Sequence, residues 1–334
     1  MGVRRPLKYL STMTESKPSP LGRLTPTSWI WRDGEFIKWD DANVHVLSHS
    51  MQFGSSAFEG IRCYATPRGP AIFRLEEHLL RLANSCKIYR MELKYSVDEL
   101  VAACCELVER NQVDACYLRP MVLRGYGAAS MVPFASPVEV FLPCWPWGAY
   151  LGDDALTNGV DACVSTWNRV APNTLPSMAK VAGNYLSGQL VKMEALANGF
   201  AEGISLDTDG YVSEGSGQNL FVVLGGAVYT SPLGSLLPGI TRDSVLTLAR
   251  DAGIAASEKQ IPREMLYIAD EVFLTGTASE VIPVRSVDRI QVGNGQRGPV
   301  THQLQQRFLD VAHGVAADEH GWLTHVRAER PVTT

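Results

Sequence analysis

The sequence has no apolar run of the ~18 to 20 residues that a membrane-spanning helix needs. Charge is also scarce: 19% of its 334 residues are Asp, Glu, Lys or Arg, and the formal net charge is −5. Because no long apolar run is present, we do not expect a membrane protein. Because no basic excess is present to neutralise a phosphate backbone, we do not expect a nucleic-acid-binding protein either. The hydrophobic fraction of 46% is typical of a globular chain, and the length predicts about two domains.

The seven cysteines form no C-x-x-C pair, and most of them lie inside apolar runs. This pattern is typical of reduced, buried thiols in a cytoplasmic protein, so we expect neither a structural zinc site nor a disulfide framework. His45 and His49 have an i,i+4 spacing, but their nearest carboxylates are Asp40 and Asp41. We therefore expect no metal site.

The composition divides the chain into segments. Residues 1–28 carry basic residues, Ser, Thr and four prolines, and we predict a disordered extension; the alternatives are a transit peptide and a start at Met13. The polar, glycine-containing stretch 148–159 is predicted to be an interdomain loop. It separates a small N-terminal α/β domain, 29–147, from a larger domain, 160–325, that a tail at 326–334 follows. Helical and strand patterns mix irregularly, which favours an α+β (mixed α/β) fold over a regular βαβ array.

Local patterns predict the main elements. A hairpin is expected at 29–39 around Asp33-Gly34, and helices are expected at 75–90, from Ser96 onward, at 183–198 and at 301–313. Ser96 and Glu99 have the spacing of a capping box, and Gly199 follows the third helix as its terminator. The apolar runs 115–123 and 138–145 are each predicted to be one strand.

Lys180 is the first candidate for chemistry. It is the only cation between Arg169 and Lys192, and small or apolar residues surround it in the sequence. A lysine in such surroundings loses hydration, its pKa falls, and the neutral amine can form a Schiff base with a carbonyl. The alternative is a lysine at a helix end whose aliphatic stem is covered by these neighbours.

Four further segments can serve a ligand. Glu214 stands among glycines before an apolar strand, which suits the ring nitrogen of a flat ligand but also fits an ordinary strand end. The turn before Thr241 and the turn 275–280 offer amides and hydroxyls to an anion, although each is also explained as a plain cap or turn. Tyr117 and Arg119 share one strand face and together suit a carboxylate, or else mark a wet edge strand.

The order of short motifs resembles one family, the branched-chain amino-acid aminotransferases. The motifs are Phe58-Glu-Gly-Ile-Arg62, Tyr117-x-Arg119-Pro, Trp147-Gly-Ala-Tyr150, Ala179-Lys180, Gly183-Asn-Tyr185, Ser213-Glu-Gly215, Leu237-Pro-Gly-Ile-Thr-Arg242 and Gly276-Thr-Ala278. These enzymes depend on pyridoxal 5'-phosphate and have the two-domain fold-type IV architecture of D-amino-acid aminotransferase. The resemblance runs from about Trp29 to Trp322, and the missing C-x-x-C makes the chain more similar to the bacterial enzymes.

The resemblance implies a role for each matching residue. Lys180 bonds to the cofactor and shuttles a proton, Glu214 pairs with the pyridine nitrogen, and Tyr185 binds the ring oxygen. The phosphate is implied at Arg81, Ile240, Thr241 and Thr277. The substrate carboxylate is implied at Tyr117 with Thr277 and Ala278, and the second carboxylate of glutamate or 2-oxoglutarate at Arg119. The aliphatic pocket is implied at Phe58, Trp147 and Tyr150, with Gly60 and Arg62 nearby.

The function implied is transamination of L-leucine, L-isoleucine and L-valine with 2-oxoglutarate, by a cytoplasmic homodimer or higher homo-oligomer. Alternatives in the same fold are a D-amino-acid transaminase, an R-selective amine transaminase and aminodeoxychorismate lyase. A non-catalytic module that keeps the fold is a further alternative, and the presence of both Lys180 and Glu214 is against it.

Overall fold

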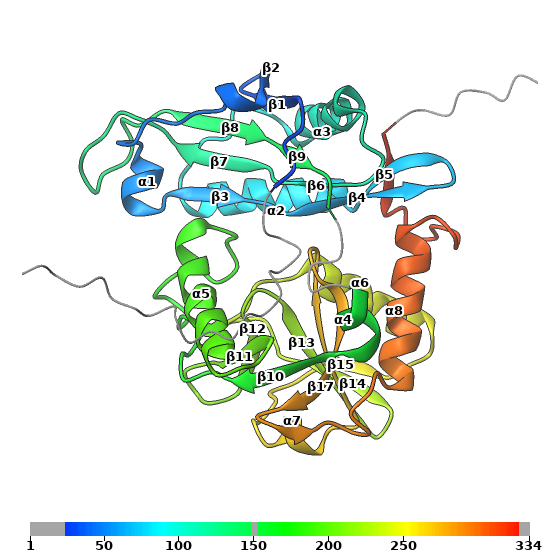
Figure 1. Ribbon diagram of the computed structural model, residues 1–334. Coiled ribbons are helices and arrows are strands. Elements are labelled where there is room, and N and C mark those ends of the chain that lie inside the picture. Colours follow the sequence, from blue (N-terminus) through cyan, green and yellow to red (C-terminus); the bar gives the residue numbers. More distant parts are fainter. Residues whose placement is uncertain (1–23, 148–152, 327–334) are drawn as a thin grey trace, which may run out of the picture.

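The computed structural model of the protein describes residues 24–147 and 153–326, which form two lobes (Figure 1). Tyr150 lies outside these residues. Most of the predicted disordered extension and most of the predicted tail also lie outside them. The N-terminal lobe contains β1 (Trp29–Arg32), β2 (Glu35–Lys38), α1 (His49–Phe53), β3 (Ser56–Phe58), β4 (Ile61–Thr66), β5 (Gly69–Phe73), α2 (Leu75–Ile88), α3 (Val97–Asn111), β6 (Cys116–Leu118), β7 (Met121–Arg124), β8 (Val138–Leu142) and β9 (Cys144–Trp145).

The C-terminal lobe begins after the gap in the described residues. It contains α4 (Asp153–Asn158), β10 (Val160–Val164), α5 (Ala182–Ala197), β11 (Glu202–Leu206), β12 (Val212–Gly215), β13 (Asn219–Leu224), β14 (Ala227–Thr230), α6 (Ile240–Asp251), β15 (Ala256–Glu258), α7 (Met265–Ile268), β16 (Glu271–Gly276), β17 (Glu280–Val287), β18 (Ile290–Gln291) and α8 (Pro299–Ala312). The last strand, β19 (Leu323–His325), returns to the N-terminal lobe and pairs with β5.

Two five-stranded sheets build the N-terminal lobe, in the orders β2-β1-β8-β7-β3 and β19-β5-β4-β6-β9. The prediction of one strand at 115–123 and one at 138–145 is wrong. Each run is divided between the two sheets, at Pro120 and at Pro143 respectively. Proline has no N–H for a sheet ladder, so the chain changes sheets there, and the Arg119 N–H donates to the Pro143 carbonyl (2.9 Å).

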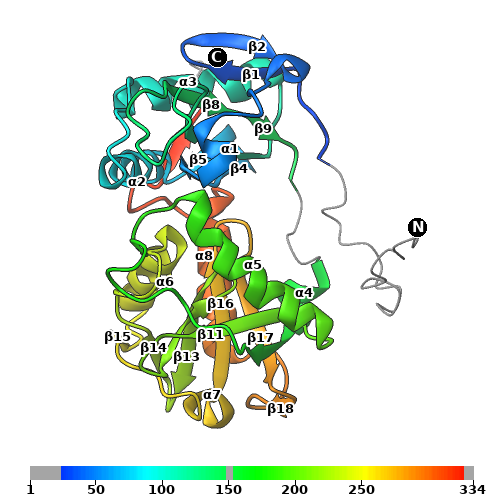
Figure 2. The same ribbon diagram turned by 90° about the vertical axis from the view of Figure 1, so that its left-hand side faces the viewer.

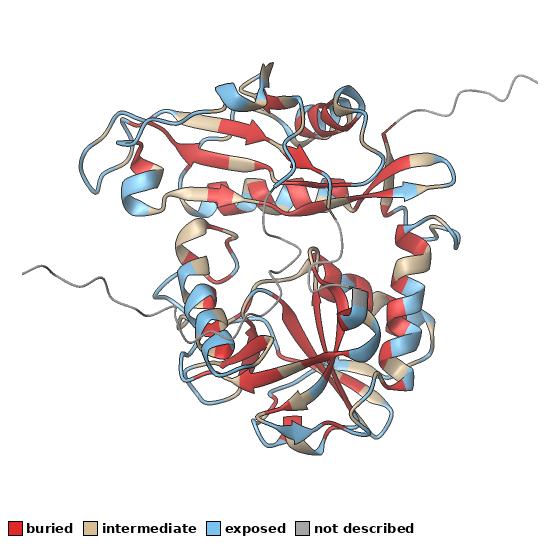
Figure 3. Cartoon of the chain, in the orientation of Figure 1, coloured by how far each residue is buried: buried red, intermediate tan, exposed pale blue. Residues whose placement is uncertain are grey.

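One nine-stranded sheet forms the centre of the C-terminal lobe, in the order β12-β11-β10-β17-β16-β13-β14-β15 with β18 beside β17. The side chains of β13 alternate between two hydrophobic clusters, with Leu220 and Val222 on one face and Phe221 and Val223 on the other. The sheet is therefore buried on both faces, as the red central strands in Figure 3 show, and α6 and α8 cover one of them.

The helices largely follow the predicted signals. The capping box of Ser96 and Glu99 is present at α3. Gly199 has φ +77° just beyond α5, as the prediction of a glycine terminator requires. Figures 1 and 2 show α5 rising from the C-terminal lobe with its first turn against the N-terminal lobe. None of the helices described here is long and apolar enough to cross a membrane.

Candidate active site

Two neighbouring cavities meet between the lobes. They share the lining residues Lys180, Tyr185, Ser216, Gly217, Gln218 and Thr277. The first cavity is mostly polar and is bordered by the start of α6. The second is bordered by aromatic residues of the N-terminal lobe. A ligand in one cavity and a second ligand in the other would thus meet at Lys180.

The segment before α5 fixes Lys180 between the lobes. Its N–H donates to the Ser85 hydroxyl of α2 (2.9 Å), and its carbonyl accepts from the Phe58 N–H (3.0 Å). The flanking Ala179 and Val181 are buried in the hydrophobic core of the N-terminal lobe. The backbone of Lys180 is therefore held rigidly, while its side chain points into the cavities.

The Lys180 amine donates a hydrogen bond to the Tyr185 hydroxyl and lies 4.8 Å from the centre of the Phe58 ring. Burial lowers the pKa of Lys180 from 10.5 to about 8, with the nearby Glu59 carboxylate opposing the shift and Arg81 adding to it. Burial likewise raises the pKa of Tyr185, with the Glu214 charge adding to it. An appreciable fraction of the lysine is therefore a neutral nucleophile near neutral pH, as the sequence predicts.

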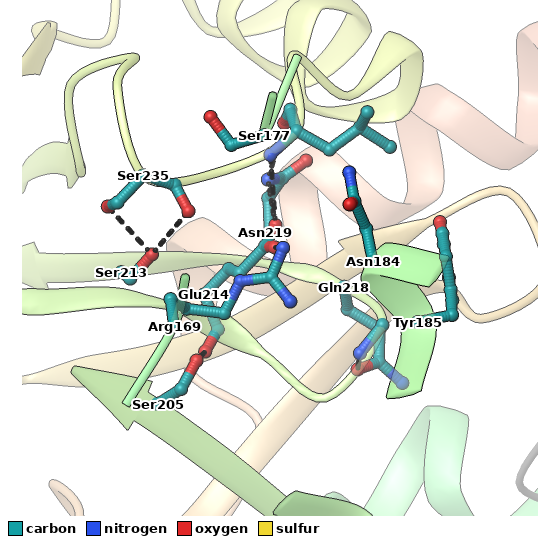
Figure 4. A network of polar contacts seen from close by, with 12 residues as sticks. Arg169, Ser177, Asn184, Tyr185, Ser205, Ser213, Glu214, Gln218, Asn219 and Ser235 are labelled. Carbon is teal, nitrogen blue, oxygen red and sulfur yellow. Dashed lines mark hydrogen bonds and ion pairs between the residues drawn. The ribbon is translucent and has the colours of Figure 1, made fainter. Parts of the chain in front are cut away.

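Glu214 is the last residue but one of β12, and its carboxylate is surrounded by partners (Figure 4). Its Oε1 pairs with Arg169 (2.7 Å), and its Oε2 accepts from Asn219 (3.2 Å) and from the Leu237 N–H (3.3 Å). Burial raises the pKa of Glu214, and Arg169 opposes that rise. A carboxyl group with a raised pKa is suited to share a proton with a basic ring nitrogen beside it.

Arg81 and the start of α6 lie together at the first cavity. The guanidinium is held by both oxygens of the fully buried Glu59 (2.7 and 2.9 Å) and donates to the Pro238 carbonyl (2.8 Å). Gly239 caps α6 without a side-chain hydrogen bond, so the amides of Ile240 and Thr241 begin the helix uncapped. A cation beside a helix N-terminus is the usual setting for a phosphate.

Glu59 sets the charge of this corner. Burial acts to raise its pKa, but Arg81 and His78 hold that pKa well below its usual range. The Nδ1–H of His78 donates to the same carboxylate (2.7 Å), and burial lowers the pKa of the His78 ring. Glu59 therefore stays ionised and fixes the direction of the Arg81 guanidinium.

The second cavity has an aromatic wall. The rings of Tyr117 and Trp147 lie 4.7 Å apart, and the Arg119 guanidinium lies 4.9 Å from the centre of the Phe58 ring. A Cβ at position 60 would stand 1.8 Å from the Tyr117 hydroxyl, so Gly60 leaves the space that this hydroxyl needs. Nε of Arg119 is buried and has no hydrogen-bond partner among the described residues.

The seven residues predicted for the cofactor all line the first cavity: Arg81, Lys180, Tyr185, Glu214, Ile240, Thr241 and Thr277. Seven predicted for the substrate line the second: Phe58, Gly60, Tyr117, Arg119, Trp147, Thr277 and Ala278. Arg62 is absent from both linings as far as the described residues show, and its guanidinium pairs with Glu280 instead. The roles of the predicted cofactor and substrate residues toward a ligand stay predictions.

Glu59, Arg169 and Asn219 are among the residues of the site that had no predicted role. Glu59 and Asn219 stand in or beside the quoted motifs, but their partners Arg81 and Glu214 are identified only by the folded chain. Arg169 is distant in sequence from Glu214, and nothing in the sequence pairs them. Among the residues that the structure describes, no cluster of three or more His, Cys, Asp or Glu side chains is arranged for a metal ion.

The comparisons with known proteins agree on one family. The family described as amino-transferase class IV matches residues 56–287. A branched-chain-amino-acid aminotransferase of Escherichia coli K12 is 50% identical over 300 residues, 89% of this chain and 97% of that one. A crystal structure of the Escherichia coli enzyme has a TM-score of 0.89 at 49% identity, and covers 90% of this chain and 100% of its own.

A third relative is the T.th. branched-chain amino acid aminotransferase, solved in complex with N-(5'-phosphopyridoxyl)-L-glutamate. Its TM-score is 0.87 at 42% identity, over 91% of this chain and 100% of its own. The resemblance predicted from the ordered motifs and the α+β fold with the fold-type IV architecture are thereby confirmed. This chain belongs to the class IV aminotransferases.

Proposed function

We propose that this chain transfers the amino group of L-leucine, L-isoleucine or L-valine to 2-oxoglutarate, with pyridoxal 5'-phosphate as its cofactor. The names of its relatives support these substrates, and the phosphopyridoxyl ligand in the T.th. structure supports this cofactor. One observation in this chain carries the proposal. The Lys180 amine, with its lowered pKa, lies where a polar, anion-binding cavity meets an aromatic one.

The residues of the first cavity fit pyridoxal phosphate. Arg81 and the uncapped start of α6 suit the phosphate, Glu214 the ring nitrogen, Tyr185 the ring oxygen, and Lys180 the aldehyde. The buried hydroxyl of Thr275, beside this cavity, has no hydrogen-bond partner among the described residues. Pyridoxal phosphate supplies an aldehyde that captures the substrate amine and a ring that withdraws electrons from the substrate Cα.

Three residues then do the proton chemistry. Glu214 keeps a proton at the ring nitrogen, which strengthens the electron withdrawal. Lys180 removes the proton from the substrate Cα and delivers it to C4′ of the cofactor. Tyr185, bonded to the Lys180 amine, orients that amine and donates to the ring oxygen O3′.

The second cavity explains how one site takes both leucine and glutamate. Phe58, Tyr117 and Trp147 offer an apolar surface to an aliphatic side chain. Arg119 stands against the Phe58 ring without an ion pair in the described parts of the chain, so it can meet the second carboxylate of 2-oxoglutarate. The α-carboxylate, which all the substrates share, is assigned to Tyr117 and the turn at Thr277 and Ala278.

The visible spectrum of the purified protein tests this proposal. We expect the absorption band of lysine-bound pyridoxal phosphate to disappear on addition of L-leucine and to return on addition of 2-oxoglutarate. D-alanine and a simple chiral amine without a carboxylate are the controls. A band that responds only to D-alanine or to the amine would assign the chain to another branch of the fold. Lys180→Ala should lose the band and all turnover.

Exposed apolar side chains support a homodimer or a higher homo-oligomer. Along α5, Leu186, Leu190, Met193 and Leu196 are exposed on one helical stripe, with Leu186 at 61% and Met193 at 55%. Sedimentation velocity of the holoprotein tests this part of the proposal.

We also propose a cytoplasmic location and a role in branched-chain amino acid biosynthesis, and the seven free cysteines support the location.

A further inference from the structure

The turn between β16 and β17 carries Thr277, Ala278 and Ser279 into the second cavity. Gly276 and Glu280 are paired across its base, and Glu280 has φ +58°. Such a tight hairpin usually places glycine at a left-handed position, because a side chain there strains the backbone. A glutamate therefore adds backbone strain at this position, and strained positions cluster at functional sites.

The carboxylate of Glu280 reaches across to the other lobe. Its Oε1 pairs with Nη1 of Arg62 (2.9 Å) and accepts a hydrogen bond from the Tyr64 hydroxyl (3.0 Å). The side chains of Arg62 and Glu280 are only 12% and 7% exposed, and Tyr64 is buried. Arg62 and Tyr64 stand two residues apart on β4 and so share one face of the strand.

The two ends of this contact lie outside the second cavity, but each is close in sequence to residues that line it. β4 follows directly after Gly60, over which the Tyr117 hydroxyl stands, whereas Glu280 follows directly after the turn that presents Thr277 and Ala278. Away from water the attraction between Arg62 and Glu280 is strong, and the hydrogen bond from Tyr64 to the same oxygen is directional, so together they fix the distance between the groups that they join. Here they fix the turn relative to Tyr117.

We propose that Glu280, held by Arg62 and Tyr64, is a positioning residue that sets the turn 277–279 against Tyr117 for the substrate carboxylate. Arg62 accordingly acts through Glu280 and not by touching the substrate. This inference deepens the proposed function, and its kinetic test rests on that function. Every substrate amino acid and oxo acid has the carboxylate, whereas the proton transfer at Lys180 does not use the turn.

Glu280→Gln and Glu280→Gly together test the contact of Glu280 with Arg62 and Tyr64. Glutamine keeps the size and the backbone strain but loses the charge, while glycine removes the strain as well. We expect both variants to raise the KM of L-leucine and of 2-oxoglutarate alike, by about tenfold, with kcat nearly unchanged. If Glu280 served the backbone alone, Glu280→Gly would equal or better the unchanged protein, and that result would overturn the proposal.

Arg289→Gly is the matched control. Arg289 also has a left-handed backbone, at φ +66°, in a turn of the same lobe, and its guanidinium bonds to the Asn198 carbonyl. It lines neither cavity in the described chain, so its replacement should leave both KM values unchanged. Equal KM changes in Arg289→Gly and Glu280→Gly would show a general loosening of the lobe and would contradict the positioning role of Glu280.

Hydrogen exchange of the holoprotein without substrate gives a readout that does not depend on turnover. The amides at 277–279 should exchange faster in Glu280→Gln than in the unchanged protein or in Arg289→Gly. The double variant Arg62→Met with Glu280→Gln removes both charges together and leaves neither one buried alone. It should exchange no faster than Glu280→Gln alone, because the two residues act as one unit. Unchanged exchange in Glu280→Gln, or faster exchange in the double variant than in Glu280→Gln alone, would refute the proposal even if transamination itself were not found.

Discussion

Glu59 and Glu214 show how individual buried charges prepare the site. Glu59 is held ionised by Arg81 and His78, so it anchors the guanidinium that we assign to the phosphate. Glu214 is paired with Arg169, and burial leaves the pKa of Glu214 raised. The first carboxylate is a fixed charge, and the second is ready to share a proton.

Replacing Glu214 with glutamine tests the second of these roles. Glu214→Gln keeps the shape of the side chain, so we expect the cofactor to stay bound and coloured. The amide cannot hold a proton at the ring nitrogen, so transamination should slow on the order of a hundredfold or more. The rate is measured as loss of the visible band after a single addition of L-leucine.

Glu271→Gln is a suitable control for this variant. Glu271 is also a buried glutamate of the C-terminal lobe, but it caps α8 through the amides of Val300 and Thr301. Its replacement should lower thermal stability and leave the transamination rate intact. An unslowed Glu214→Gln would remove the role that we assign to Glu214.

The lowered pKa of Lys180 predicts the pH dependence of cofactor capture. Below the pKa the amine is protonated and cannot attack an aldehyde, so the rate should rise with pH and level off above about 8. At pH 7 about a tenth of the amine is neutral, against fewer than one in about a thousand for a lysine at 10.5. Stopped-flow absorbance of the apoprotein mixed with pyridoxal phosphate, from pH 6 to 10, measures this rate. A rate that still climbs at pH 10 would mean an unshifted lysine.

At the scale of elements, α5 and the turn after β12 must approach closely for the two cavities to meet. A Cβ on Gly188 of α5 would lie 2.1 Å from the Ser216 carbonyl oxygen. Gly188→Ala should therefore push the helix away from the turn, destabilise the protein by about 1–3 kcal/mol and weaken cofactor binding. Thermal melting and a cofactor titration of the apoprotein measure the two effects.

Gly183 of the same helix provides the comparison. A Cβ there meets nothing within 4 Å, so Gly183→Ala should range from neutral to stabilising by about 1 kcal/mol. If both alanine variants lost the same stability, the cause would be the helix as a whole and not the contact at Ser216.

Elements with local signals could be predicted from the sequence, and elements that depend on distant pairing could not. The periodic apolar faces and the capping box predict α2 and α3 well. The sequence pattern does not predict β17, because Pro283 interrupts its apolar run and proline argues against a central strand. The strand tolerates Pro283 because β17 pairs with β10 only through Val284 and residues after it.

The site divides in the same way. Residues whose chemistry stands out in the sequence, such as Lys180 and Glu214, were found at the cavities. Residues that matter through a partner, such as Arg169, Glu59 and Glu280, depend on contacts between segments far apart. The predicted division into domains stays a prediction, and it did not foresee that β19 returns to the N-terminal lobe.

At the scale of the whole molecule, polar contacts join the two lobes around the cavities. Arg74 at the start of α2 donates to the Ile240 carbonyl and to Asp243 (3.2 and 2.7 Å), and Arg81 donates to the Pro238 carbonyl. The backbone of Lys180 is bonded to Ser85 in the opposite lobe. A ligand in the first cavity touches both lobes, so its binding adds to the contacts that keep them together.

Cofactor binding should therefore stabilise the whole chain and not one lobe. Pyridoxal phosphate at a hundred times its Kd contributes about 2.7 kcal/mol, so we expect the holoprotein to melt several degrees above the apoprotein in a single transition. Lys180→Ala with saturating pyridoxal phosphate should keep part of this gain, because Arg81, Glu214 and the start of α6 still hold the ligand. Scanning calorimetry of the three samples measures the shifts. A gain confined to one of two separate transitions would show that the ligand binds a single lobe, and the placement of Arg81 at the phosphate would then be wrong.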